Sequence, residues 1–301
     1  MMVRAGHDEA RAGGLIASAS IIAPITPPSI AFVIFGAAAN VSITQLFLAG
    51  IVPGLLMAVA INLTWFVVAK KEQATPTVKA TRAERLKARR ESTRALALPV
   101  MLLVGLKMGA FTPTEAAVVA ALYALFVSIV IYREMKLSQL YEVFVTAAKA
   151  TAVIMFLVAA ALISAWLIAV ASLLQELIAM LQPLLDKPML LMLVIMPIVI
   201  AVGTAMDMTR TILILTPVLM PLVKAAGIDP VHFGVLFVTN NAIGLVTPPV
   251  GTVLNVIAGV GKMKMDAVTH GVLPFMCAQF AAPFLLVLFP QIVLWPLKLF
   301  Y

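Results

Sequence analysis

The sequence is poor in charge, cysteine and histidine, and each shortage excludes a class of protein. Asp, Glu, Lys and Arg make up 11% of the 301 residues, whereas hydrophobic residues make up 63% and the mean hydropathy is +1.10. An ordinary water-soluble domain does not have this composition. The single cysteine, Cys277, excludes an internal disulfide, and His7, His232 and His270 lack the spacing of a metal site. The composition therefore predicts an integral membrane protein.

Aromatic residues are also scarce, at 7%, and no long segment alternates between polar and apolar residues, which argues against a transmembrane β-barrel. Several apolar stretches instead reach the roughly 20 residues that an α-helix needs to cross the hydrocarbon. The predicted fold is all-α, that of a polytopic membrane protein. The sequence lacks a nucleophile paired with a base, a zinc-type His cluster and a phosphate-binding loop, so we expect neither an enzyme nor an organic cofactor.

The formal net charge of +8 comes largely from one short segment, residues 70–94, between two hydrophobic spans. Its basic residues are Lys70, Lys71, Lys79, Arg82, Arg85, Lys87, Arg89, Arg90 and Arg94. Positive charge near the ends of spans is retained on the cytoplasmic side, so this segment is predicted to be a cytoplasmic loop rather than a nucleic-acid surface. Contact with anionic lipid is a second possibility.

The chain contains an internal repeat. Shifting the sequence by 221 residues places Pro27-Pro28 on Pro248-Pro249, and the same shift aligns further residues without a gap. These include Gly6 with Gly227, Asp8 with Asp229, Gly13 with Gly234, Thr26 with Thr247, Gly50 with Gly271 and Pro53 with Pro274. Two copies of one unit, each with a Pro-broken apolar helix, point to a secondary transporter with its binding site between symmetry-related halves.

Loop charges predict the orientation of the two copies. The predicted spans are 46–69, 95–111, 113–132, 143–172 and 267–296, with cytoplasmic turns at Arg133 with Lys136 and at Lys262 with Lys264, and an outer end at Lys298. Segment 6–40 then runs from inside to outside, and its partner 227–261 runs the opposite way. The repeats are therefore predicted to be inverted.

Two adjacent prolines remove two amide donors and force the preceding residue out of helical geometry, so each paired segment must unwind within the membrane. Carbonyl groups freed there are tolerated where they line a cavity or bind something. The carbonyls of Gly244, Thr247 and Val250, with the Thr247 hydroxyl, could converge on one sodium ion. Ala23, Thr26 and Pro28 supply the equivalent set in the first repeat. The alternative is a proline kink that serves packing alone.

At these residues the chain resembles the large membrane subunit of the tripartite ATP-independent periplasmic (TRAP) transporters. The resemblance rests on motifs along nearly the whole chain: Ala49–Gly54, Gly109–Ala117, Ile212–Pro221, Gly227–Gly234 and Gly244–Gly251. It implies an elevator-type, sodium-driven importer of organic anions in the bacterial inner membrane. It also implies two partners, a periplasmic substrate-binding protein and a small membrane subunit.

The resemblance further implies a re-entrant hairpin at 188–224 with its tip at Gly203–Arg210. A short apolar run interrupted by Asp207 and Arg210, with Lys224 soon after, agrees with a hairpin. One sodium site would join Gly203 to Gly244, Thr247 and Val250, and the second would use Ala23, Thr26 and Pro28.

Arg210 is the best single candidate for binding a substrate carboxylate, because a guanidinium can bind one in bidentate fashion. Asp207 lies one helical turn earlier and could instead simply neutralise it. Thr239, Asn240 and Asn241 interrupt an apolar helix and could offer polar groups to a substrate, or could serve helix packing. The identity of the anion, which could be a C4-dicarboxylate, a sugar acid or a keto acid, stays open.

We divide the chain into a broken helix at 1–45, a span at 46–69, the basic loop 70–94, further membrane helices at 95–182, the hairpin 188–224, a second broken helix at 225–265 and a last span at 266–301. Compared with the family pattern, the chain begins partway through the first repeat. An inward-side hairpin with a Ser-Gly-Ser tip is therefore expected upstream of Met1. Three explanations stay open: the sequence is truncated, the missing part is a separate chain, or the protein is defective in transport.

Two other functions stay open at this point. One is an anion transporter of another elevator type, coupled to protons or sodium and working without a binding protein. The other is a truncated membrane scaffold that does not transport.

Overall fold

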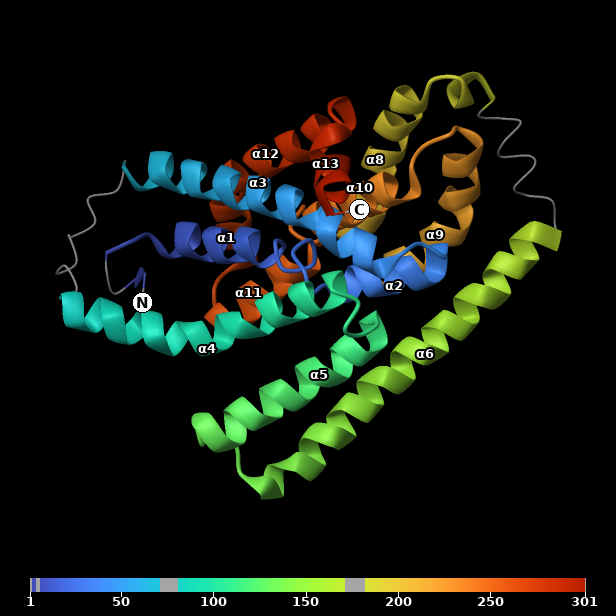
Figure 1. Ribbon diagram of the computed structural model, residues 1–301. Coiled ribbons are helices and arrows are strands. Elements are labelled where there is room, and N and C mark those ends of the chain that lie inside the picture. The colour runs from blue at the N-terminus through green and yellow to red at the C-terminus, as the bar shows by residue number, and fades with distance from the viewer. Residues whose placement is uncertain (1, 4–5, 71–80, 171–181, 301) are drawn as a thin grey trace. The chain divides into compact units, whose positions relative to one another are not determined.

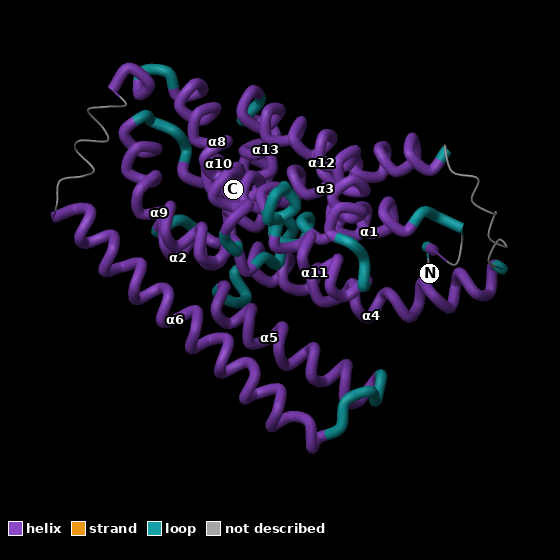
Figure 2. Tube along the Cα trace, turned by 180° about the vertical axis from the view of Figure 1, so that it is seen from behind, coloured by secondary structure: helices purple, strands orange, loops and turns teal. Residues whose placement is uncertain are grey.

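The computed structural model describes residues 2–3, 6–70, 81–170 and 182–300, and every regular element within these ranges is a helix (Figures 1 and 2). The predicted all-α fold is confirmed. The chain divides into two compact units. One comprises Met1–Pro76 with Ala160–Tyr301, and the other comprises Thr77–Ala159.

The first repeat consists of α1 (Glu9–Ser20), α2 (Ile30–Ala39) and α3 (Ile43–Ala69). Asp8 begins α1, because its carboxylate accepts the Arg11 amide at 3.0 Å. Ser29 and Ser42 cap α2 and α3 in the same way, each accepting an amide three residues later. Short polar caps thus start helices inside an otherwise apolar sequence.

The second repeat has the same order: α10 (Pro230–Gly244), α11 (Thr252–Gly261) and α12 (Met265–Leu288). Asp229 caps α10 as Asp8 caps α1, and Gly6 and Gly227 both have positive φ. Both Pro-Pro peptide bonds, at positions 27–28 and 248–249, are cis and lie between the paired helices. The repeat found in the sequence is therefore a repeat of structure.

The two repeats interlock. Helix α1 packs along α12, and α3 packs against both α12 and α10. A Cβ added at Gly14 of α1 would overlap the backbone of Gly271 in α12, so glycine permits this close approach. Nearby, the buried Gln279 amide of α12 donates to the Ser18 carbonyl of α1 at 2.9 Å. The core of this unit thus lies between the repeats.

Helices α8 (Pro188–Ala205) and α9 (Met208–Ala225) occupy the predicted hairpin, with α8 packed on α10 and α9 packed on α2. Figures 1 and 2 both show α9 beside α2. Each helix is also long and apolar enough to count as a candidate span. Length and composition therefore do not separate a re-entrant hairpin from two spans, and the re-entrant path stays a prediction.

Residues 71–80 of the predicted basic loop lie outside the described residues, and a helix begins within the remainder. Helix α4 (Arg82–Lys107) begins within the basic segment, because Thr81 and Glu84 form a reciprocal capping box. The hydrogen bonds from the Thr81 amide and hydroxyl hold the pKa of Glu84 below its ordinary value. Only the end of α4, Ala95–Lys107, is apolar, and it is shorter than the roughly 20 residues of a full span.

The rest of the second unit consists of α5 (Pro113–Phe126), a π-helical turn η2 (Val127–Ile131), a 3₁₀ turn η3 (Leu137–Gln139) and most of α6 (Leu140–Val170). Within the candidate span Leu137–Ser164, no residue of the most hydrophobic window is buried. Side chains such as Phe156 and Leu162 are exposed. The apolar side chains of this helix are those expected of a membrane-spanning segment.

The predicted last span, 267–296, contains parts of two helices. The structure divides it at Phe289 and Pro290 into α12 and α13 (Gln291–Phe300), and α13 packs on α3. Pro290 has no amide to donate to the Leu286 carbonyl four residues earlier. The buried His232 of α10 lies there instead, with Nε2 2.9 Å from that oxygen.

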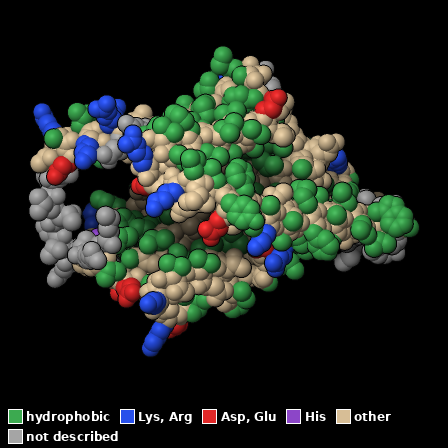
Figure 3. Space-filling model, turned by 90° about the horizontal axis from the view of Figure 1, so that it is seen from below, with side chains coloured by type: hydrophobic (Ala, Val, Ile, Leu, Met, Phe, Trp, Pro, Cys, Tyr) green, Lys and Arg blue, Asp and Glu red, His purple; other side chains and the backbone are tan. Residues whose placement is uncertain are grey.

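Among the described residues, six helices are long and apolar enough to cross a membrane: Ile43–Ala69, Pro113–Ile131, Leu137–Ser164, Pro188–Ala205, Met208–Ala225 and Met265–Leu288. Figure 3 shows hydrophobic side chains spread over much of the face in view, with charged side chains as scattered exceptions. These features are those of a multi-pass membrane protein. The direction in which each helix crosses stays a prediction.

Candidate ion and substrate site

The second break meets the tip of the α8–α9 hairpin. Gly244, the last residue of α10, lies directly against Gly203 in the last turn of α8. A Cβ added at Gly244 would lie 2.8 Å from both the Gly203 carbonyl carbon and the Ile200 oxygen. Both glycines are buried. Only residues without a side chain permit this contact, so the predicted pairing of Gly203 with Gly244 is present in the structure.

Two hydrogen bonds strengthen this contact on either side of the glycines. The Gly251 amide, after the break, donates to the Thr204 carbonyl at 3.2 Å. The Asn241 side-chain amide, before the break, donates to the Met208 carbonyl at 3.2 Å. The tip is thus joined to the broken helix on both sides of the cis peptide.

The remaining members of the predicted set lie within this break. Thr247 is partly exposed and Val250 is 42% exposed. The Thr247 hydroxyl donates to the Ile243 carbonyl at 2.7 Å, which leaves the lone pairs of its oxygen able to accept. Among the residues that the structure describes, no group of three His, Cys, Asp or Glu side chains could hold a metal. A cation here would therefore be bound by carbonyl and hydroxyl oxygens.

The first break carries the corresponding residues in an open setting. Ala23, Thr26 and Pro28 are all exposed. The Thr26 hydroxyl oxygen would lie 2.6 Å from a Cβ added at Gly54 of α3, so this side chain packs against a helix of its own repeat. Within the described ranges, the hydrogen bonds between the hairpin tip and a broken helix all go to the second repeat.

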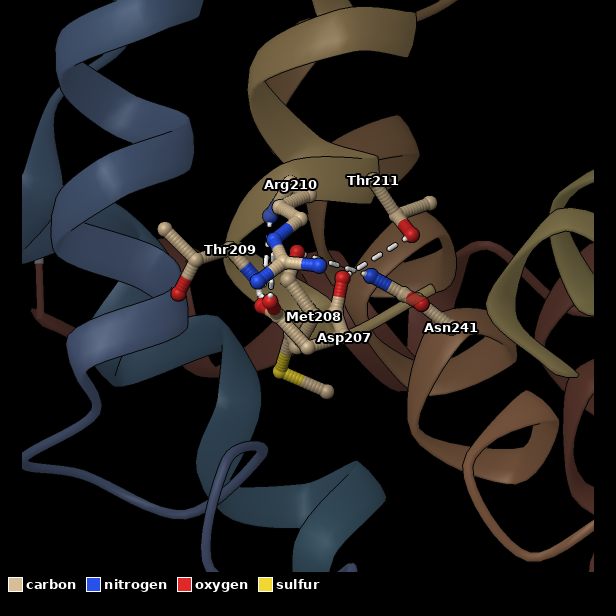
Figure 4. A network of polar contacts seen from close by, with 6 residues as sticks. All are labelled: Asp207, Met208, Thr209, Arg210, Thr211 and Asn241. Atoms are coloured by element: carbon tan, nitrogen blue, oxygen red, sulfur yellow. Dashed lines mark hydrogen bonds and ion pairs between the residues drawn. The ribbon is translucent and has the colours of Figure 1, made fainter. Parts of the chain in front are cut away.

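Asp207 and Arg210 form an ion pair at the tip. Arg210 Nε lies 3.0 Å from Asp207 Oδ2, and the two side chains are 60% and 45% exposed. The other oxygen of Asp207 accepts the Thr209 and Arg210 amides at 2.8 and 3.3 Å, which caps α9. Figure 4 shows the guanidinium folded back over this carboxylate. Asp207 thus partly neutralises Arg210 but leaves it accessible.

Asn240 and Asn241 are both buried in α10. Asn240 donates to the Leu236 carbonyl of its own helix at 2.7 Å, and its surroundings include the α8 residues Met192 and Val199. Asn241 reaches Met208 rather than the Arg210 side chain (Figure 4). The Oδ1 atom of each has no hydrogen-bond partner within the described residues. This geometry favours packing for Asn240 and positioning of the tip for Asn241, and a contact with substrate stays a prediction for both.

The sequence analysis missed Asn255 of α11. Its side-chain amide donates to the Val250 carbonyl at 3.1 Å, which orients one of the oxygens predicted to bind sodium. A lone amide within the apolar segment Thr252–Gly261 was the available signal. The equivalent position in the first repeat is Ile34, so the repeat alignment did not indicate it.

A unit that occurs twice, each time with a helix broken at Pro-Pro, and a helical hairpin whose tip contacts one break are features of the secondary transporters. The comparisons with known proteins give the particular family.

Residues 1–292 match the family described as tripartite ATP-independent periplasmic transporter, DctM component, and the chain belongs to this family. It is 51% identical to the 2,3-diketo-L-gulonate TRAP transporter large permease protein YiaN of Escherichia coli, over 99% of this chain and 70% of that protein. It is 39% identical to the sialic acid TRAP transporter large permease protein SiaM of Vibrio cholerae, over 96% and 67%. It is 36% identical to the C4-dicarboxylate permease DctM of Pseudomonas aeruginosa, over 91% and 64%.

Family membership confirms the resemblance seen in the sequence. The chain is a large TRAP permease of the bacterial inner membrane, a transport subunit and not an enzyme.

Proposed function

We propose that the chain uses a sodium gradient to import an organic acid anion that a periplasmic binding protein delivers. A small membrane subunit of the DctQ type completes the translocator, and lipid surrounds it. Sodium is the coupling ion, no organic cofactor takes part, and the substrate crosses by an elevator-type movement. The alternative is an ion-coupled anion carrier that takes up free substrate without a binding protein.

The contact between the hairpin tip and the second break carries this proposal. Gly203 and Gly244 meet at a point where a helix ends and carbonyl groups lose their regular partners. Carbonyl and hydroxyl oxygens are hard donors that suit a small hard cation. The hairpin tip also carries Arg210, so an anion and a sodium ion would bind at the same junction of the tip with the broken helix. Binding of one would then favour binding of the other.

The names of related permeases support an organic acid as substrate. Those relatives carry 2,3-diketo-L-gulonate, sialic acid and C4-dicarboxylates in their names. All of these are carboxylates at neutral pH, which an exposed guanidinium such as Arg210 can bind.

Uptake into vesicles tests the proposal. The chain is reconstituted with its small membrane subunit and binding protein, and accumulation of radiolabelled diketogulonate, sialic acid and succinate is measured. We expect accumulation of at least one probe with an inward sodium gradient and none with an equal potassium gradient. Accumulation that is unchanged when potassium replaces sodium contradicts the proposal. Uptake without the binding protein favours the alternative carrier.

A further inference from the structure

The hairpin tip contains one positive and one negative side chain, and its packing partners add almost no charge. Helix α8 has no Asp, Glu, Lys or Arg, and the same holds for α2 and α10. Helix α12, which also contacts α8, has Asp266 only in its first turn. On α9 itself the next charged residue after Arg210 is Lys224, in the last turn. The formal charge at the tip is therefore zero.

The ion pair also limits what Arg210 can bind. A guanidinium presents five N–H donors, and Arg210 uses Nε for Asp207 Oδ2 at 3.0 Å. The side chain is 60% exposed, which keeps its terminal nitrogens accessible to one carboxylate. A second carboxylate on the same substrate would find no free cation among the packing partners of the tip and would face the Asp207 carboxylate. An unpaired charge at membrane depth is costly.

We propose that Asp207 sets the charge of the substrate: the permease takes organic acids with a single negative charge and discriminates against the dianion of the same skeleton. This inference rests on the proposed function. Asp207 is a specificity-determining residue, since it limits Arg210 to one carboxylate. The remainder of the substrate is uncharged.

Matched pairs of ligands test this inference. Gluconate and glucarate differ in one terminal carboxylate, and lactate and malate form a smaller pair with the same contrast. The purified full chain in nanodiscs is titrated with each compound in sodium buffer at pH 7.5, and the apparent Kd is read from the shift in thermal unfolding. For wild type we expect the monoanion of at least one pair to bind at least about tenfold more tightly than the dianion, because the second carboxylate of the dianion stays unpaired. A tenfold difference in Kd corresponds to about 1.4 kcal/mol.

The variant Asp207→Asn removes the negative charge and keeps the helix cap, because Asn caps a helix as well as Asp does. We expect it to bind the dianion more tightly and to reduce the ratio between the two ligands to below about threefold, about 0.65 kcal/mol. Asp186→Asn, which removes an acid before α8, is the matched control and should keep the wild-type ratio. Arg210→Gln should lose binding of both ligands.

Three results overturn the inference: a wild-type preference for the dianion, an unchanged ratio in Asp207→Asn, and no response to any of the four compounds. None of them bears on sodium-driven uptake, which the vesicle assay measures separately. The inference and the proposed function can therefore fail independently.

Discussion

The two helix breaks share their backbone geometry and differ in what surrounds them. Each follows an Asp-capped helix, contains a cis Pro-Pro bond and precedes a second short helix. Gly244 of the second break is buried against Gly203 and Thr247 is partly exposed, whereas the aligned Ala23 and Thr26 of the first break are exposed. The break by itself therefore does not enclose a binding site. Within the described residues, the hydrogen bonds from the hairpin tip to a broken helix go to the second break, so we expect the second break to bind sodium more tightly than the first.

Gly244→Ala should have the largest effect, because it separates the tip from the second break. The added Cβ would lie 2.8 Å from the backbone of Gly203, which cannot rotate away. We expect a destabilisation of about 1–3 kcal/mol and a loss of sodium-induced stabilisation. Thermal unfolding with and without sodium measures both. Gly259→Ala is the control, since a Cβ there meets nothing within 4 Å. If both variants had the same stability and the same stabilisation by sodium, the contact of the tip with the second break would not matter for sodium binding.

Thr247→Val and Thr26→Val compare the breaks at one aligned position. The change replaces the hydroxyl by a methyl group of similar volume. At Thr247 we expect the sodium affinity to fall about tenfold, equivalent to about 1.4 kcal/mol, and at Thr26 to fall by less than that. The apparent sodium Kd, from unfolding temperatures over a sodium titration, is the measurement. A larger loss at Thr26 would show that the first break is the tighter site.

Ser29→Ala should have the smallest effect and should be confined to the first break. The Ser29 hydroxyl caps α2 and also donates to the Pro24 carbonyl. We expect a loss of about 1 kcal/mol in the free energy of unfolding, with the sodium response unchanged. The aligned residue in the second repeat, Val250, has no hydroxyl to lose. If Ser29→Ala changed the stabilisation by sodium, the first break would contribute to sodium binding, which contradicts this prediction.

The sequence predicted the features that local chemistry decides. Adjacent prolines cannot continue a helix, so both breaks were predictable, and the ion pair between Asp207 and Arg210 was one of the alternatives that the sequence left open. The end of α12 was not predictable. Pro274 and Pro283 lie inside this helix, yet Pro290 ends it, although all three give the same local signal.

Tertiary contacts make that difference. His232 lies at the carbonyl that Pro290 leaves without an amide donor, and α13 packs on α3 beyond the break. Contacts between α10 and the hairpin tip, such as that of Asn241 with Met208, join residues 33 apart and leave no periodic signal either. The surroundings of the candidate site residues were therefore not predictable from the sequence, and the binding of sodium by their oxygens stays a prediction.

The carbonyl of Pro24 aligns with that of Leu245, and the two copies hold this oxygen by different donors. In the first copy the donor is the Ser29 hydroxyl, and in the second it is the backbone amide of Val253, at 3.1 Å. The two repeats therefore satisfy an aligned backbone oxygen with different donors, one from a side chain and one from the backbone. The hydrogen bond is present in both repeats although the group that supplies it differs, so a comparison of side chains alone would miss it.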